Sequence, residues 1–137
     1  MTDIVYEVES NLDTYEFIDV LNKSTLGERR PVDDLSRIKM MCENANLIVT
    51  ARMDGKLIGV ARSITDFTYC TYLSDLAVDK DYQKNGIGKR LIEETKKQAP
   101  QAKLILLSAP AAIDYYPKIG MKKHNQCFIL DDIRELK

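Results

Sequence analysis

The sequence predicts a mixed α/β fold, in which antiparallel and parallel strands share one sheet that is covered by helices. Short apolar runs typical of strands alternate with segments whose apolar residues recur at helical spacing. Asp54-Gly55 joins two of the apolar runs and indicates a tight antiparallel hairpin. The run from Lys103 to Ser108 follows a helix and is apolar on both faces, which is typical of a central strand reached by a helical crossover.

The first third of the chain is predicted to form one strand and two helices. Apolar and polar side chains alternate from Asp3 to Val8, as in a strand with one buried face. Asn11 or Asp13 can cap a first helix, and Asp33 and Asp34 stand where negative charge favours the start of a second. The apolar positions of these helices are Tyr15, Phe17, Ile18 and Leu21 in the first, and Leu35, Ile38, Met41 and Cys42 in the second.

The middle of the chain predicts a three-strand antiparallel meander over residues 47–78. Asp54-Gly55 supplies the first turn, and Asp66, Phe67 and Thr68 supply the second, between Ile64 and Tyr72. A helix is expected from Gly86 to about Gln98, where Pro100 ends it. After the strand at residues 103–108, the apolar run Gln126–Leu130 is expected to close the sheet, and a charged tail follows.

Composition narrows the class of protein. At 137 residues the chain fits a single domain, residues 1–137, with a substantial core. A net charge of −1 argues against a general nucleic-acid binder. The chain holds no apolar run of membrane-spanning length and no signal-peptide pattern, and its three scattered cysteines match neither a disulfide framework nor a zinc site. We therefore expect a cytoplasmic protein without a metal.

The stretch from Asp75 to Ile92 is the strongest functional pattern. An apolar strand ending at Val78 leads through a polar loop into a helix, and Gly86 and Gly88 stand at the junction. The first turn of a helix has backbone N–H groups without partners and carries partial positive charge. Glycines let a phosphate approach that backbone closely, and three basic side chains are nearby: Lys84, Lys89 and Arg90. The stretch predicts a pyrophosphate site.

The spacing of the glycines narrows the choice of phosphate-containing ligand. A nucleotide P-loop needs Ser or Thr where Arg90 stands, and a dinucleotide fingerprint needs glycine where Leu91 stands. The pattern that fits is Gln83-x-x-Gly86-x-Gly88 between a strand and an amphipathic helix. It resembles the acetyl-CoA-binding motif of the GCN5-related N-acetyltransferase (GNAT) superfamily, which is Arg/Gln-x-x-Gly-x-Gly/Ala.

A second motif supports the same resemblance. Pro110 suits the first turn of a short helix, and Gly120 suits its C-terminal end. The segment from Tyr116 to Met121 resembles the superfamily's Tyr-x-x-x-Gly-Phe pattern, with Met121 in place of Phe as the apolar plug. Ala109 stands where many members have an Asn that hydrogen-bonds the pantetheine arm, so this chain departs from the family pattern at that contact.

The resemblance covers the chain from its first strand to Leu130 and implies a fold and an activity. The implied fold is a mixed sheet of six or seven strands with about four helices, in which the central parallel strands, about 70–78 and 103–108, splay apart to admit the pantetheine. The implied function is acetyl transfer from acetyl-CoA directly to an amine. The alternative is a CoA-binding sensor or interaction module without catalysis. The residues implied at the cofactor are Leu76, Ala77, Val78, Gln83, Lys84, Asn85, Gly86, Ile87, Gly88, Lys89, Arg90 and Tyr116.

The chemistry of such a transfer suggests roles for individual residues. The family polarises the thioester carbonyl with a backbone amide of the splayed strand, which here means Leu76, Ala77 or Val78. Tyr116 occupies the position of the family's general acid, and tyrosine stays protonated at neutral pH; Tyr115 is expected to pack. The base is open: Asp75, the only carboxylate within its strand, serves either as base or as a structural cap, and water is the alternative.

The amine and the assembly are less specified. We expect residues 22–34 and the turn at residues 65–69 to form the acceptor side, since the family varies this region most. Glu28, Arg29 and Arg30 lie there, either as a solvated turn or with an arginine against the acceptor. The acceptor is a small-molecule or peptide amine, and His124 is expected at the surface. The apolar run Cys127–Leu130 suggests a homodimer, as in many relatives.

Overall fold

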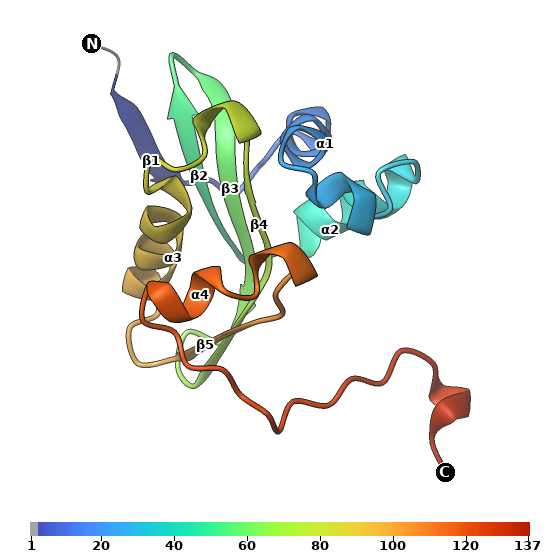
Figure 1. Cartoon of the computed structure of the whole chain (residues 1–137). Helices are drawn as coiled ribbons and strands as arrows, with labels where there is room; N and C mark the ends of the chain where they lie inside the picture. Colours follow the sequence, from blue (N-terminus) through green and yellow to red (C-terminus); the bar gives the residue numbers. More distant parts are fainter. Residues whose placement is uncertain (1–2) are drawn as a thin grey trace. The chain divides into compact units, whose positions relative to one another are not determined.

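The computed structural model describes residues 3–137, and the chain divides into two compact units that meet between Leu107 and Ser108. The first unit contains a mixed five-stranded sheet with helices on both faces (Figure 1). Its strands are β1 (Ile4–Val8), β2 (Leu47–Met53), β3 (Lys56–Thr65), β4 (Cys70–Val78) and β5 (Lys103–Leu106). Spatial order equals chain order, so the predicted meander over β2, β3 and β4 is confirmed.

Two predictions about the strands are corrected. The described sheet has five strands rather than six or seven, because Gln126–Leu130 forms no ladder and its side chains are exposed. An apolar run becomes a strand only where a sheet edge pairs with its backbone, and sequence pattern does not report that pairing. β5 was expected at the centre of the sheet but is its last strand, parallel to β4, and every second side chain of β5 is exposed.

The first unit has three α-helices, and the first two begin where their capping residues predict. They are α1 (Thr14–Lys23), α2 (Leu35–Asn44) and α3 (Ile87–Gln98). Asp13, rather than Asn11, caps α1 by accepting the N–H of Glu16, and Asp34 caps α2 by accepting that of Arg37. α3 ends at the residue expected from Pro100.

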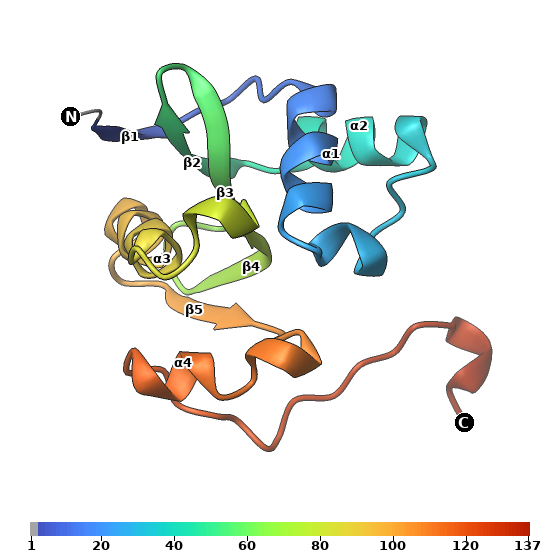
Figure 2. The same ribbon diagram turned by 45° about the horizontal axis from the view of Figure 1, so that its top comes forward.

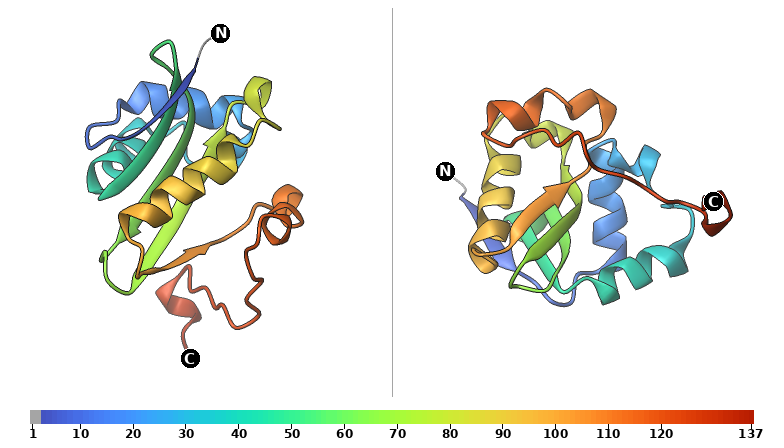
Figure 3. Two further views of the ribbon diagram at one scale, coloured as in Figure 1. Left: turned by 90° about the vertical axis from the view of Figure 1, so that its left-hand side faces the viewer. Right: turned by 90° about the horizontal axis from the view of Figure 1, so that it is seen from below.

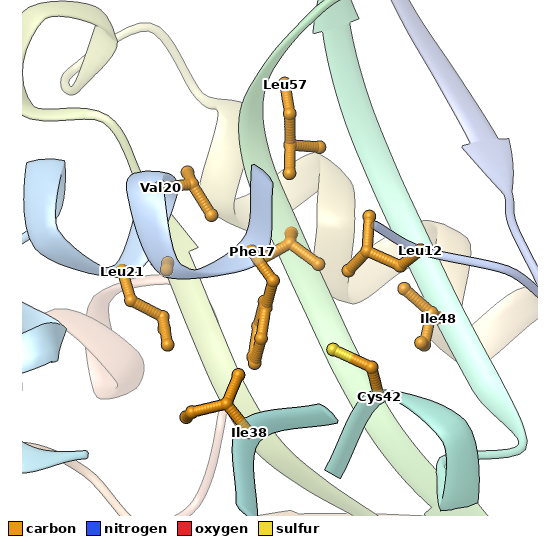
Figure 4. Packing of buried hydrophobic residues seen from close by; sticks show 10 residues of the cluster. Leu12, Phe17, Val20, Leu21, Ile38, Cys42, Ile48 and Leu57 are labelled. Atoms are coloured by element: carbon orange, nitrogen blue, oxygen red, sulfur yellow. The ribbon is translucent and has the colours of Figure 1, made fainter. Parts of the chain in front are cut away.

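The helices lie on opposite faces of the sheet and create two cores. Figure 2 shows α3 on one side of the strands and α1 and α2 on the other, and Figure 3 shows α3 lying across the sheet. Phe17 of α1 is fully buried at the centre of one core, between α2 and the sheet (Figure 4). Leu91 and Ile87 of α3 fill the other.

Gly59 of β3 lets α3 approach the sheet closely. A Cβ at this position would lie 3.1 Å from a methyl group of Leu91 and 3.2 Å from one of Ile87, both on α3. Such contacts are tighter than van der Waals packing allows without a shift of the neighbours. The helix that follows the glycine loop is therefore seated directly on the strands beside β4.

The second unit is mostly irregular. It contains a 3-10 turn at Pro110–Ala112, the short helix α4 (Tyr115–Lys118), and another 3-10 turn at Ile133–Glu135. Gly120 follows α4 with a φ of 100°, a left-handed conformation that glycine adopts without strain. Gly120 thus stands at the expected place, whereas Pro110 opens a separate 3-10 turn and not the helix that Gly120 follows. Within residues 3–137, no helix has the length and apolar character needed to span a membrane.

Candidate active site

The loop Gln83–Gly86, here called the cofactor loop, connects the end of β4 to α3 through a short 3-10 turn (Figure 1). All four of its residues are exposed, and both Lys84 and Gly86 have left-handed backbones, with φ of 69° and 76°. Positive φ in lysine costs free energy and is concentrated at functional sites. The loop therefore holds a conformation that the strand and helix at its ends impose.

The N-terminus of α3 is open. Gly86 is its N-cap residue, and no side chain caps the helix. The first bond of the helix runs from the N–H of Arg90 to the carbonyl of Gly86 at 3.0 Å, so the N–H groups of Ile87, Gly88 and Lys89 precede the helical ladder. A Cβ at Gly86 would meet nothing within 4 Å. Backbone donors without helical partners, the helix dipole and free space beside Gly86 are the features of a site that can bind an anion.

The side chains of the cofactor loop divide into two groups. Gln83 donates to the carbonyl of Val78 and Asn85 to that of Tyr82, each at 3.0 Å, so these amides support the loop itself. Lys84 and Lys89 are exposed and form no ion pair with any described residue. Their positive charge next to the start of α3 can attract an anion.

Arg90, which was expected at the cofactor, is engaged elsewhere. Its guanidinium lies over the ring of Tyr6 in β1, 4.7 Å from the centroid, and its Nε lies 2.9 Å from a carboxylate oxygen of Glu94. Both partners draw the side chain along α3 toward β1. That Arg90 binds the cofactor stays a prediction, and its charge already has two partners.

β4 has an open edge beside the cofactor loop. Only Cys70–Leu73 pair with β5, so Ser74–Val78, here called the open edge, have no strand partner on that side. The pairing of β4 with β5 thus ends at Leu73, which agrees with the prediction that these two parallel strands splay apart. The N–H of Asp79 donates to Ile58 of β3, and ladder alternation then directs the backbone of Ala77 toward β3. The backbone groups of Leu76 and Val78 face the open side, where the Val78 carbonyl accepts from Gln83.

A β-bulge at Ser74 determines which side chains face which core. Asp75 pairs with Arg62 and Leu73 with Ser63, so Ser74 has no partner in β3. The extra residue shifts the alternation of β4: Leu73 packs in the core under α3, whereas Asp75 turns to the face that α1 and α2 cover. Bulges are frequent beside active sites, where they redirect side chains.

Asp75 is completely buried between two arginines. One carboxylate oxygen accepts from Nε of Arg30 and the other from Nε of Arg62. The same guanidinium groups donate to Ser74, from Arg30 to its carbonyl at 2.9 Å and from Arg62 to its hydroxyl at 3.0 Å. Of the alternatives left open by the sequence, this geometry favours a structural role for Asp75 over a base. Arg30 lies against Asp75 rather than in a solvated turn.

Sequence reasoning missed the pairing of Asp75 with Arg30 and Arg62. Arg62 stands within a run of buried residues in β3, and a charged residue in such a run indicates a buried partner. The position of Arg62 in this apolar run could therefore have predicted a buried carboxylate partner. Arg30 lies 45 residues before Asp75, in a loop, and no local pattern connects the two.

Tyr116 belongs to α4 in the second unit. Its ring meets that of Tyr115 edge to face, with centroids 5.2 Å apart and planes at 75°. Burial raises the pKa of Tyr116 above its ordinary value, and Tyr115 adds a smaller rise. The raised pKa keeps the hydroxyl protonated at neutral pH, so it remains a donor.

No three His, Cys, Asp or Glu side chains among residues 3–137 gather as metal ligands. The resemblance implies acetyl-CoA as the only cosubstrate. The open N–H groups at the start of α3 match the chemistry of its pyrophosphate. The open edge of β4 presents a backbone to which an extended amide-containing arm can hydrogen-bond.

Comparisons with known proteins identify the family of this chain. A family model described as the acetyltransferase (GNAT) domain matches residues 24–137. The uncharacterized N-acetyltransferase ycf52 of Pyropia yezoensis is 27% identical over 128 residues, which cover 88% of this chain and 71% of that protein. The UPF0039 protein C11D3.02c of Schizosaccharomyces pombe is 25% identical over 140 residues, 96% of this chain and 91% of that protein.

Solved structures share the fold. The GNAT family protein SP0256 of Streptococcus pneumoniae superposes with a TM-score of 0.76 at 16% identity, over 95% of this chain and all of that one. The aminoglycoside N-acetyltransferase AAC(6')-Iy, solved in complex with CoA, gives a TM-score of 0.74 at 13% identity and covers 97% of both chains. Because the family model spans most of its length and these folds agree, the chain belongs to the GNAT acetyltransferase family.

Proposed function

We propose that this protein is an acetyl-CoA-dependent N-acetyltransferase that moves the acetyl group directly to the nitrogen of an amine. The family confirms the coarser prediction, an acetyltransferase. The observation that most supports the finer one is the uncapped N-terminus of α3 beside the open edge of β4. A phosphate-binding helix end and an unpaired strand backbone are the two surfaces that a long phosphorylated thioester needs.

The binding step uses backbone groups more than side chains. The N–H groups of Ile87, Gly88 and Lys89 receive the pyrophosphate, while Lys84 and Lys89 attract its charge. The backbone of Leu76 and Val78 binds the pantetheine arm and polarises the thioester carbonyl. Ala77, predicted alongside them, directs its N–H to β3 instead. Loss of such a polarising donor typically raises a barrier by about 3–4 kcal/mol.

Proton transfer involves Tyr116 and water. The hydroxyl of Tyr116, which its raised pKa keeps protonated at neutral pH, donates a proton to the departing thiolate and then regains one from water. The attacking amine loses its proton to water, because both oxygens of Asp75 already accept from arginines. The placing of Tyr116 at the thiolate rests on the family motif.

The amine is the open part of this proposal. Aminoglycoside acetyltransferases occur among the structural neighbours, one of them in complex with sisomicin at 20% identity, and likeness at that level shows the fold alone. The acceptor classes to compare are a polyamine, an amino acid, an aminoglycoside, a peptide N-terminus and a peptide lysine. The cytoplasmic location and the homodimer stay predictions.

The test is a turnover screen. Purified protein is given acetyl-CoA and each class of amine, free thiol is followed with a chromogenic disulfide, and the acetylated product is identified by mass. We expect thiol release that depends on one class of amine. Tight CoA binding by calorimetry without turnover on any amine would support the alternative, a CoA-binding module, and contradict the enzyme.

A further inference from the structure

Arg30, Arg62 and Asp75 form a buried cluster, the Arg30–Asp75–Arg62 cluster, which the proposed reaction does not consume. Arg30 lies between α1 and α2, Arg62 in β3 and Asp75 in β4. The exposed fractions of their side chains are 22%, 7% and 0%. Burying charged groups costs more than burying apolar ones of similar size, so such clusters add little stability over a hydrophobic replacement. The hydrogen bonds that the cluster makes to neighbouring segments indicate a role beyond stability.

The cluster holds the β-bulge. A bulge leaves its extra residue without a ladder partner, and here that residue is Ser74. Arg30 donates to the Ser74 carbonyl and Arg62 to its hydroxyl, while Asp75 binds both arginines. Ser74 and Asp75 directly precede Leu76, the first residue whose backbone faces the open side of β4.

The cluster also holds the acceptor side of the first unit. Arg30 donates to the carbonyl of Arg29 at 2.9 Å, within the loop expected to contact the amine. Arg62 donates to the carbonyl of Met41 in α2 at 3.1 Å. Through the two arginines, the carboxylate of Asp75 thus connects β4 with α2 and with the α1–α2 loop, residues 24–34.

We propose that Arg30 and Arg62 are positioning residues which, through Asp75 and Ser74, hold the open edge of β4 and the α1–α2 loop in the arrangement that acetyl transfer requires. This inference rests on the function proposed above. It assigns Asp75 to positioning rather than to proton transfer. The pyrophosphate site at Ile87–Lys89 lies outside the cluster, so the two contributions are separable.

The kinetic test replaces Arg30 by glutamine and uses Arg52 as the matched control. Arg52 is 20% exposed and pairs with Glu9 and Glu16, so Arg52→Gln removes a comparable ion pair on the strand two positions away from β4. We expect Arg30→Gln to lower kcat about 10- to 100-fold, as misplaced reacting groups do, and to raise the Kd for CoA by a smaller factor, because the pyrophosphate site lies outside the cluster. Arg30→Lys, which keeps the charge and one donor, should be intermediate. Equal kcat in Arg30→Gln and Arg52→Gln would overturn the proposal.

Amide hydrogen exchange tests the cluster without turnover. Peptides covering residues 74–79 should exchange faster in Arg30→Gln than in the wild type, and should be unchanged in Arg52→Gln. Unchanged exchange in Arg30→Gln would refute the positioning role. If the wild type acetylates no amine, the proposed function fails, but this comparison still decides whether the cluster holds the open edge.

A pH profile separates positioning from proton transfer at Asp75. Asp75→Asn keeps the shape of the side chain and an acceptor for one arginine. If Asp75 is a positioning residue, Asp75→Asn lowers kcat, but kcat falls off at the same acidic pH as in the wild type. If Asp75 is the base, that fall at acidic pH disappears. Should Asp75→Asn fail to fold, the profile of Arg30→Lys replaces it, and an acidic fall of kcat shifted by that change would contradict the positioning role.

Discussion

At the scale of single residues, the two residues considered for proton transfer, Tyr116 and Asp75, differ in environment. Asp75 is enclosed, with both oxygens occupied, and Tyr116 has a raised pKa with a hydroxyl that remains protonated. A group that must accept a proton needs a free lone pair and access to the substrate, whereas a donor needs only to stay protonated. The environments suit Tyr116 as a donor and Asp75 as a buried partner of two guanidinium groups.

Tyr116→Phe tests the donor. The change keeps the ring and removes only the hydroxyl, so turnover should fall roughly 10²–10⁴-fold if proton donation assists the thiolate, with CoA affinity preserved. The acid works in its protonated form, so kcat should fall as pH rises through the pKa of Tyr116. Because that pKa is raised, this decline belongs above pH about 10.

Tyr115→Phe is the control for this change, since it removes a hydroxyl from the adjacent ring. Its turnover should stay within about twofold of the wild type. Steady-state rates across pH 6 to 11, by thiol release, check both variants. A Tyr116→Phe enzyme as fast as the wild type would mean that the thiolate leaves unassisted.

At the scale of elements, β4, the cofactor loop and α3 act as one binding unit. The open edge ends where Gln83 holds the loop, and the loop ends at the uncapped helix. Gly59 seats α3 against the sheet, which fixes the helix end in relation to β4. Backbone groups should therefore contribute more to CoA binding than the basic side chains do.

Gly86→Glu tests this order of contributions. The new side chain would add negative charge where the pyrophosphate binds, and we expect CoA affinity to fall on the order of 100-fold or more. Lys84→Ala removes only an exposed, screened charge and should cost no more than about fivefold. Calorimetric titration with CoA at two salt concentrations measures both.

Gly55→Glu supplies the control for backbone strain. Gly55 is an exposed glycine with a φ of 82° and, like Gly86, has open space around a Cβ. Gly55→Glu and Gly86→Glu strain the backbone alike, but only Gly86→Glu should weaken CoA binding. If Lys84→Ala weakens binding as much as Gly86→Glu, the site is a basic patch and not a backbone cradle.

At the scale of the whole molecule, two separate cores hold the sheet. Phe17 is the largest fully buried side chain of the core under α1 and α2, and the core under α3 is built around Leu91. The first core also supports the α1–α2 loop that carries Arg30. Its packing therefore affects both the stability of the fold and the acceptor side.

Phe17→Ala should destabilise the protein by about 3–5 kcal/mol, the usual cost of the lost burial and the cavity. Tyr15 lies on the same helix and is 68% exposed, so Tyr15→Ala should change stability by less than about 0.5 kcal/mol. Urea unfolding followed by circular dichroism measures both. Similar midpoints for the two variants would show that the core under α1 contributes little.

Local chemistry is what the sequence by itself determined. Asp13 and Asp34 cap their helices, and Asp54-Gly55 turns its hairpin with φ of 51° and 82°. Gln83, Gly86 and Gly88 predict an anion site from the same kind of local pattern. Each of these depends on neighbours within a few residues, so their conformational preferences and hydrogen bonds can be deduced from the chain alone.

Pairing between distant segments was decided only by the tertiary structure. The apolar run Gln126–Leu130 has the composition of a strand, yet strand formation depends on a partner edge that no local pattern specifies. The bulge at Ser74 reversed the face on which Asp75 lies, and Arg30 reached it across 45 residues of sequence. A register shift of one residue changes every contact beyond it, which is why the role of Asp75 became visible only in the folded chain.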